Sequence, residues 1–228
     1  MEKQELSSHR SKANAKPLNP TLLSIKNKLK FGRRWSSNPQ KQLCFTWLSR
    51  ILAESASYDT TLDVACGNLN NYPFVRSPYY IGVDMNKASL DYGRRAYPKA
   101  RTEPLYIEEL EASGLKGDLV LCTQTIGVNN YFDAEKTVPN IQSLISATNE
   151  GGTLAFDIGD MSIAKRGEIT ALLNAAFTTV EERGFGAHDK SSNMLFSIAL
   201  GLMMQWFPAT RTNGQETRVF YVCRDRKS

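Results

Sequence analysis

The sequence predicts an α/β fold built on a doubly wound, mostly parallel sheet. Two observations support this expectation. Residues 61–84 read as a buried strand, a tight turn at Gly67, a short helix and a second apolar strand that ends at Asp84. Residues 118–158 read as an apolar strand, a loop, an amphipathic helix and another apolar strand.

The N-terminal part of the chain has a different character. Residues 1–19 are polar and lack hydrophobic periodicity, which predicts a flexible arm. A short basic helix is expected over residues 21–29. A longer helix is predicted over residues 43–52, where apolar side chains recur in adjacent pairs every four residues.

The elements after Asp84 are predicted from the same two periodicities. In chain order they are helix 86–97, strand 104–107, strand 118–122, helix 137–148, strand 153–158, helix 167–177, strand 178–183 and strand 217–223. An insertion over residues 185–216 separates the last two strands and contains a helix with a Met-rich apolar stripe. That stripe either packs against the domain or a second subunit, or lines a pocket for a hydrophobic acceptor.

Residues 61–84 also indicate a ligand that contains a nucleoside. A turn after a parallel strand aims backbone N–H groups at a ligand, and an acid at the end of the next strand accepts hydrogen bonds from a ribose. The spacing from Asp63 to Asp84 is close to the roughly 20 residues expected for this arrangement. A dinucleotide fingerprint needs three glycines, whereas this turn has only Gly67, and Asp63 would repel a pyrophosphate.

These residues resemble the motifs of the class I, Rossmann-like S-adenosylmethionine (SAM)-dependent methyltransferases. Residues 63–68 (DVACGN) are similar to the family's first motif, an acid followed by a glycine-rich turn, and residues 81–84 (IGVD) are similar to its second. Two positions that are usually glycine in the family hold Ala65 and Leu69. The resemblance implies a seven-stranded sheet whose last two strands form an antiparallel hairpin at the C-terminal edge.

The resemblance also implies a division of the chain. Residues 1–19 are the flexible basic arm, residues 20–56 form an N-terminal helical lid, and residues 57–228 form the SAM-binding methyltransferase domain with its insertion at about 185–216. In the lid, Arg34 and Trp35 are candidates to touch the methionine carboxylate of SAM. Packing of Trp35 and solvation of Arg34 is the alternative.

The cofactor site implied by the resemblance lies at the carboxyl ends of the strands. One acid of the pair after the third strand is expected to accept the adenine amino group, although an ordinary solvated pair is the alternative. The predicted cofactor-binding residues are Asp63, Ala65, Cys66, Gly67, Asn68, Asp84, Met85, Glu108, Glu109, Thr123 and Gln124.

Catalytic residues are predicted less directly, because transfer from a sulfonium requires a base only for an alcohol, a phenol or a protonated amine. His188 is one candidate, since histidine is the natural base near neutral pH, although a surface turn is the commoner explanation of such a residue. Asp157 or Asp160, at the end of the fifth strand, and Tyr131 are the other candidates. No metal ion is expected.

The charge of the chain is concentrated at its N-terminus. The net charge is +5, yet residues 1–41 alone contain ten Lys or Arg against Glu2 and Glu5. A basic arm can meet RNA, an anionic membrane surface or an acidic substrate. Few aromatic residues are interleaved with these charges, so nucleic acid is an alternative partner and is not favoured.

Cysteine usage favours the cytoplasm. The four cysteines, at positions 44, 66, 122 and 223, show no paired spacing, which is typical of reduced thiols. The N-terminus has no apolar segment of the kind found in secretory signals. The most apolar run, residues 194–207, is too short to span a membrane.

We therefore expect a SAM-dependent methyltransferase that acts on a small-molecule or glycan-type acceptor, at oxygen. An RNA methyltransferase that uses the basic arm is one alternative, and a non-catalytic SAM-binding protein is another. The residues after the fourth strand (CTQTIG) are unlike the Asn/Asp-Pro-Pro-aromatic pattern of amino-methyltransferases that act on bases. The sequence leaves the oligomeric state open.

Overall fold

The computed structural model describes residues 39–127, 134–159, 164–186 and 216–228. The predicted arm (1–19), the basic helix (21–29), Arg34, Trp35 and the helix of the insertion lie outside these residues.

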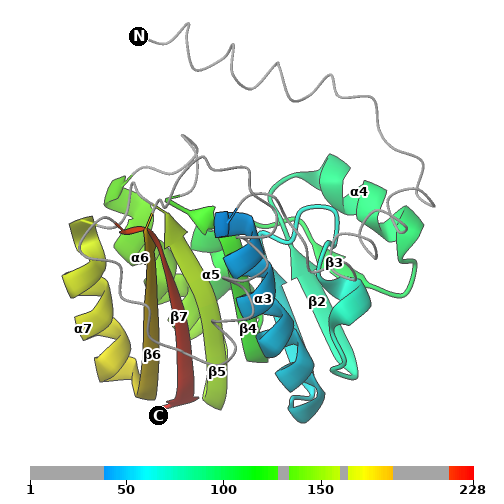
Figure 1. Cartoon of the computed structure of the whole chain (residues 1–228). Helices are drawn as coiled ribbons and strands as arrows, with labels where there is room; N and C mark the ends of the chain where they lie inside the picture. Colours follow the sequence, from blue (N-terminus) through cyan, green and yellow to red (C-terminus); the bar gives the residue numbers. More distant parts are fainter. Residues whose placement is uncertain (1–38, 128–133, 160–163, 187–215) are drawn as a thin grey trace, which may run out of the picture.

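The fold is a seven-stranded mixed sheet flanked by helices (Figure 1). The strand order is β3-β2-β1-β4-β5-β7-β6. The first five strands in this order pair in parallel, whereas β7 runs antiparallel to both β5 and β6. The predicted α/β class and the predicted C-terminal edge hairpin are therefore confirmed.

The strands are β1 (Thr60–Val64), β2 (Tyr79–Val83), β3 (Arg101–Glu103), β4 (Gly117–Ile126), β5 (Thr148–Gly159), β6 (Phe177–Gly186) and β7 (Glu216–Arg226). The α-helices are α3 (Pro39–Glu54), α4 (Lys87–Ala96), α5 (Leu110–Ser113), α6 (Thr137–Ser146) and α7 (Arg166–Ala176). Short 3₁₀ turns are η1 (Ser55–Ser57), η2 (Tyr72–Phe74), η3 (Ile107–Glu109) and η4 (Ala134–Lys136).

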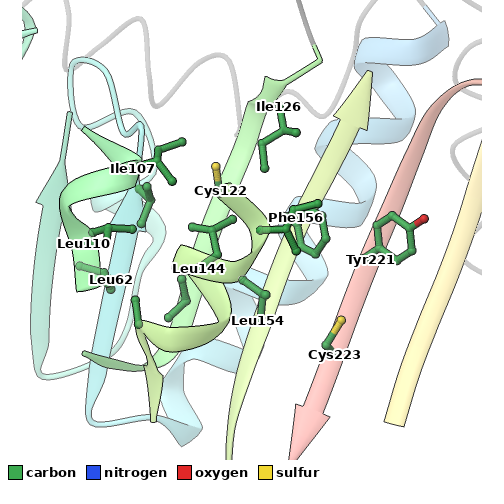
Figure 2. Close-up of a cluster of buried hydrophobic side chains, with 14 of the residues drawn as sticks. Leu62, Ile107, Leu110, Cys122, Ile126, Leu144, Leu154, Phe156, Tyr221 and Cys223 are labelled. Carbon is green, nitrogen blue, oxygen red and sulfur yellow. The ribbon is translucent and has the colours of Figure 1, made fainter. Parts of the chain in front are cut away.

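The main core lies on the face of the sheet that α5, α6 and α7 cover. Because side chains alternate between the two faces of a strand, Val120 and Cys122 of β4 point to this face with Leu154 and Phe156 of β5 (Figure 2). They pack with apolar residues of the helices, including Leu110, Leu144 and Leu173. Phe156 and Tyr221 of β7 stack with ring centroids 5.0 Å apart.

Helix α3 covers the opposite face. Its residues Trp47, Leu48, Ile51 and Leu52 are buried and pack on the alternate positions of β4, β5 and β7, namely Leu119, Leu121, Ala155, Phe220 and Val222. The described part of α3 therefore lies on a face of the sheet rather than at its edge. The lid role of residues 20–56 stays a prediction.

Two local predictions are wrong. The third strand was expected over residues 104–107, yet β3 is Arg101–Glu103 and Ile107 begins η3. The apolar character of Ile107 reflects burial in the main core, while β3 is an edge strand with partly exposed polar residues. The short helix expected after Gly67 is only the 3₁₀ turn η2. Among the described residues, no helix is long and apolar enough to cross a membrane.

Candidate functional site

The turn after β1 has three residues in the left-handed backbone region. Ala65, Gly67 and Leu69 have φ values of 56°, 57° and 57°. Glycine adopts this conformation readily, whereas other residues do so at a cost of roughly 1–2 kcal/mol. Three alternate positions of this turn thus have the backbone conformation typical of glycine. Only Gly67 is a glycine, and the other two positions hold Ala65 and Leu69.

Backbone hydrogen bonds hold this turn against the end of β2. The N–H of Cys66 donates to the carbonyl of Val83 at 3.0 Å, and the N–H of Gly67 donates to Asp84 Oδ2 at 2.8 Å. The N–H of Asn70 closes the turn by donating to the carbonyl of Cys66 at 3.4 Å. The first predicted motif is therefore bound directly to the acid of the second.

The side chain of Leu69 is accommodated by two glycines. Leu69 is fully buried in a cluster with Cys66 and Tyr80. A Cβ atom at Gly82 would lie 2.6 Å from Leu69 Cδ2, and one at Gly93 would lie 2.7 Å from Leu69 Cγ. Gly82 of β2 and Gly93 of α4 thus leave the space into which this leucine packs.

Asp84 is oriented by two backbone donors. Its Oδ2 accepts from Gly67 and its Oδ1 accepts from the N–H of Asn86, each at 2.8 Å. A carboxylate has about four acceptor sites, so these two bonds leave capacity for the hydroxyl groups of a ribose. Asp84 is partly exposed at the carboxyl end of β2, the edge at which ligands bind in open α/β sheets.

Asp63 lies beneath the turn. It is only 1% exposed, and its two oxygens accept from Tyr80 Oη at 2.8 Å and from Asn71 Nδ2 at 3.2 Å. Burial raises the pKa of Asp63 to about 7, against the lowering effect of these two hydrogen bonds. Asp63 is thus tied to η2 and β2 through Asn71 and Tyr80, and its contact with a cofactor stays a prediction.

The other predicted residues of the turn differ in exposure. Cys66 is 4% exposed, and burial raises the pKa of its thiol. Ala65 and Asn68 are partly buried. Met85, directly after Asp84, is 55% exposed and presents an apolar side chain beside the carboxylate.

The two acids after β3, Glu108 and Glu109, make different interactions. Glu109 Oε2 accepts from the N–H of Tyr106 at 2.8 Å and thereby caps η3. Glu108 forms an exposed ion pair with Lys136 Nζ at 3.2 Å. Glu109 is therefore held by a backbone group, whereas the partner of Glu108 is a surface lysine, in a pair of the kind that is energetically weak.

The end of β4 contributes Thr123 and Gln124. Gln124 is exposed and has φ 58°, another left-handed residue at the carboxyl edge of the sheet. Its N–H donates to Oδ1 of Asp157 in β5 at 2.7 Å, and Thr125 Oγ1 donates to the carbonyl of Thr123 at 3.1 Å. Val64 pairs with Cys122, so the end of β4 directly adjoins the turn after β1.

The structure thus brings the turn after β1, Asp84 with Met85, and the end of β4 to one edge of the sheet. Three of the candidate catalytic residues, His188, Asp160 and Tyr131, lie outside the described residues. The fourth, Asp157, is fully buried between the N–H of Gln124 and Arg218, so it does not face the site as an open base. Within the described part of the chain, no group of three or more His, Cys, Asp or Glu side chains could hold a metal ion.

Three supporting residues were missed by the sequence analysis. Asn71 and Tyr80 bind Asp63, and Arg218 lies against Asp157. Asp63 pairs with Gly82, and Tyr80, two residues before Gly82, therefore lies on the same face of the sheet as Asp63. This contact depends on the register of β1 and β2. The sequence contains no local signal for any of these contacts.

Comparison with solved structures identifies the fold as that of the class I SAM-dependent methyltransferases. The resemblance seen in the sequence is therefore confirmed for the fold. Comparison with protein-family models and with curated protein sequences finds no match.

Three solved structures illustrate the similarity. The N-methyltransferase NodS of Bradyrhizobium japonicum WM9, bound to S-adenosyl-L-homocysteine (SAH), is 12% identical, with a TM-score of 0.54 over 82% of this chain and 88% of that one. The plantazolicin methyltransferase BamL is 11% identical, with a TM-score of 0.53 over 90% and 98% of the two chains. An rRNA methylase of Streptococcus thermophilus is 13% identical, with a TM-score of 0.51 over 78% and 94%.

Proposed function

We propose that this protein is a SAM-dependent methyltransferase. The observation that carries the proposal is the position of Asp84 in this fold. Its carboxylate is fixed by the N–H groups of Gly67 and Asn86, lies beside a turn with three left-handed residues, and has acceptor capacity for a ribose.

The residues at this edge fit a nucleoside ligand. Asp84 would accept the ribose hydroxyls, Met85 would pack against the adenine, and Glu108 or Glu109 would accept its amino group. The backbone of residues 65–68, above Asp63, and residues Thr123 and Gln124 would surround the methionine part of SAM.

Bound SAM supplies a methyl carbon activated by a sulfonium. The protein's own contribution is then to hold the acceptor in line with that carbon and to exclude water, effects that can supply much of the acceleration. A base is required only if the acceptor loses a proton, and His188, Asp160 and Tyr131 remain the proposed candidates for that step.

The cofactor is tested by calorimetric titration with SAM and with SAH. The wild type should bind both ligands, and Asp84→Ala should weaken binding by about 1–3 kcal/mol, the typical cost of a lost hydrogen-bond partner. Asp91→Ala is the matched control, because Asp91 lies on α4 in an exposed pair with Arg94. Absence of binding by the wild type would refute the proposed function.

For the acceptor, we propose a small-molecule or glycan-type compound methylated at oxygen. Few aromatic residues are interleaved with the basic residues of the N-terminal arm, which does not favour a platform for nucleic acid. Buried, unpaired thiols at Cys66, Cys122 and Cys223 support a cytoplasmic location.

An RNA acceptor is the second candidate, because the basic arm could contact phosphates. Deleting residues 1–35 separates the two. RNA binding should collapse in the deletion and fall steeply with salt in the full chain, whereas turnover of a small acceptor should survive unless the lid is lost. Transfer of labelled methyl groups to none of a broad panel of acceptors, with intact SAM binding, would favour the non-catalytic alternative.

A further inference from the structure

The pairing of β4 with β5 is irregular at the candidate site. Cys122 pairs with Phe156 and Ile126 pairs with Ile158. Three residues of β4, Thr123 to Thr125, therefore lie opposite the single residue Asp157. Such bulges bend a strand and re-aim its side chains, and they are frequent next to active sites.

The centre of this bulge is held in an unfavourable conformation. Gln124 has φ 58°, which a residue with a side chain keeps only when its surroundings determine it. The N–H of Gln124 donates to Asp157 Oδ1 at 2.7 Å. Hydrogen bonds to a carboxylate are stronger than those to a neutral acceptor, so this bond is well suited to hold the bulge.

Asp157 is itself held by β7. It is fully buried, and its Oδ2 lies 3.1 Å from Arg218 Nη1, whose side chain is 14% exposed. Asp157 pairs with Phe220, so Arg218 is the diagonal neighbour on the same face. The Oδ2 atom has no hydrogen-bond donor among the described residues, which makes Arg218 an electrostatic partner rather than an aligned donor.

The bulge also adjoins the turn after β1. The register of β1 and β4 ends at Val64 and Cys122, so Ala65 leaves the sheet beside Thr123, while β4 continues. The turn at residues 65–69 and the bulge at Gln124, which both contain left-handed residues, therefore adjoin at the edge where the cofactor is proposed to bind.

We propose that Asp157 and Arg218 are positioning residues, which fix the bulge of β4 so that Thr123 and Gln124 can contact SAM. This inference rests on the proposed function for its ligand. The role of Asp157 in holding the bulge does not depend on the ligand and can be measured without it.

The first measurement is hydrogen exchange of the Gln124 amide in the full chain without ligand. Asp157→Asn keeps an oxygen but loses the charge and the pairing with Arg218, so exchange of this amide should rise by about ten-fold or more. Arg218→Met should have the same effect, and Arg218→Lys, which keeps the charge, should restore much of the protection. Unchanged exchange in both Asp157→Asn and Arg218→Met would overturn the proposal.

The second measurement is calorimetric titration of the same variants with SAH. We expect affinity to fall about ten-fold in Asp157→Asn and Arg218→Met and to recover in Arg218→Lys. Glu182→Gln is the control for a general loss of stability. Glu182 of β6 forms a part-buried ion pair with Arg166 of α7, and its substitution should leave SAH affinity unchanged.

The two measurements separate the possible failures. A wild type that binds neither SAM nor SAH would refute the proposed function and the ligand part of this inference, while the exchange data would still decide whether Asp157 holds the bulge. Raised exchange with unchanged SAH affinity would overturn the proposal that the bulge serves the cofactor. If Asp157→Asn does not fold, the Arg218→Met and Arg218→Lys pair provides the same test.

Discussion

Ala65 occupies a backbone conformation that favours glycine. Ala65→Gly should remove a strain of roughly 1–2 kcal/mol, offset by the larger entropy that glycine gives the unfolded chain. We expect a net stabilisation of about 0.5–1 kcal/mol in urea unfolding. Ala171→Gly, at an exposed position within α7, should instead destabilise by about 1 kcal/mol. Destabilisation by both substitutions would contradict the strained geometry of the turn.

Asp63 makes stability depend on pH. Burial raises the pKa of Asp63 from 3.8 to about 7, so over this range the folded protein keeps a proton that the unfolded chain has released. Because the folded state binds more protons, the free energy of unfolding falls as pH rises from about 4 to 7, with a slope of up to about 1.4 kcal/mol per pH unit.

The test is urea unfolding of Asp63→Asn and of the wild type at pH 5 and pH 8. The variant lacks this titration, so its stability relative to the wild type should be higher at pH 8 than at pH 5. Asp91→Asn, at an exposed position of α4, should show the wild-type dependence. A constant difference between Asp63→Asn and the wild type would mean that Asp63 stays ionised throughout.

At the residue scale, the sequence predicted the turn of the first motif but not the residues that hold Asp63 in place. The chemistry of Asp84 could be read from an acid at the end of an apolar strand, and the structure places it beside Gly67. The burial of Asp63 could not be read in the same way, because it depends on Tyr80 and Asn71. Those contacts are set by strand register and by the path of the loop, which no short motif encodes.

Helix α4 packs against the turn after β1 at Gly93. A methyl group there would lie 2.7 Å from Leu69 Cγ and 2.9 Å from the backbone carbon of Asn68. Gly93→Ala should therefore destabilise by about 1–3 kcal/mol through overpacking, although alanine is the better helix former.

Gly167→Ala is the matched control within a helix. A Cβ atom at Gly167 of α7 meets nothing within 4 Å, so this substitution should stabilise by about 0.5–1 kcal/mol. Chemical denaturation of both variants measures the contrast. Equal effects of the two substitutions would show that α4 can move away from the turn at little cost.

At the element scale the long periodic segments were predicted well. The helix expected over residues 86–97 is α4, capped by Asn86, whose side chain accepts from the N–H of Ser89. The prediction of the third strand was wrong for two reasons. The edge strand Arg101–Glu103 is polar, and the buried Ile107 belongs to a 3₁₀ turn. A hydrophobic residue indicates a buried position, but the secondary structure at that position depends on the surrounding packing.

Over the whole molecule, ion pairs join α3 to the C-terminal hairpin. Arg224 of β7 contacts Glu54 of α3 at 2.7 Å and Glu181 of β6 at 3.2 Å, across a sequence separation of 170 residues for the first pair. A double-mutant cycle of Glu54→Gln and Arg224→Met should give a coupling of about 0.5–1 kcal/mol that weakens with salt.

The exposed pair of Asp91 and Arg94 within α4 is the comparison for this cycle. Its coupling should be smaller, about 0.3 kcal/mol, because a local pair on a helix surface gains little. A coupling near zero would mean that the pair of Glu54 and Arg224 does not help to hold α3 on the sheet.

At the scale of the whole molecule, the order of elements was sufficient to predict the α/β class, and the resemblance predicted the antiparallel edge. The acceptor could not be identified from the sequence. The basic arm (residues 1–19) and the Met-rich insertion (residues 185–216) are each compatible with more than one role. Among the solved structures of this fold are an N-methyltransferase, a plantazolicin methyltransferase and an rRNA methylase. The fold by itself therefore does not specify the acceptor.

The place of β7 between β5 and β6 has a consequence for folding. In a growing chain β5 and β6 are synthesised before the strand that joins them, so β5 remains an open edge until β7 arrives. Unpaired edges invite association with other chains, and closing a pairing between distant segments is slow. We therefore expect the sheet to close late, through an intermediate that holds β1 to β5 and in which aggregation competes with insertion of β7.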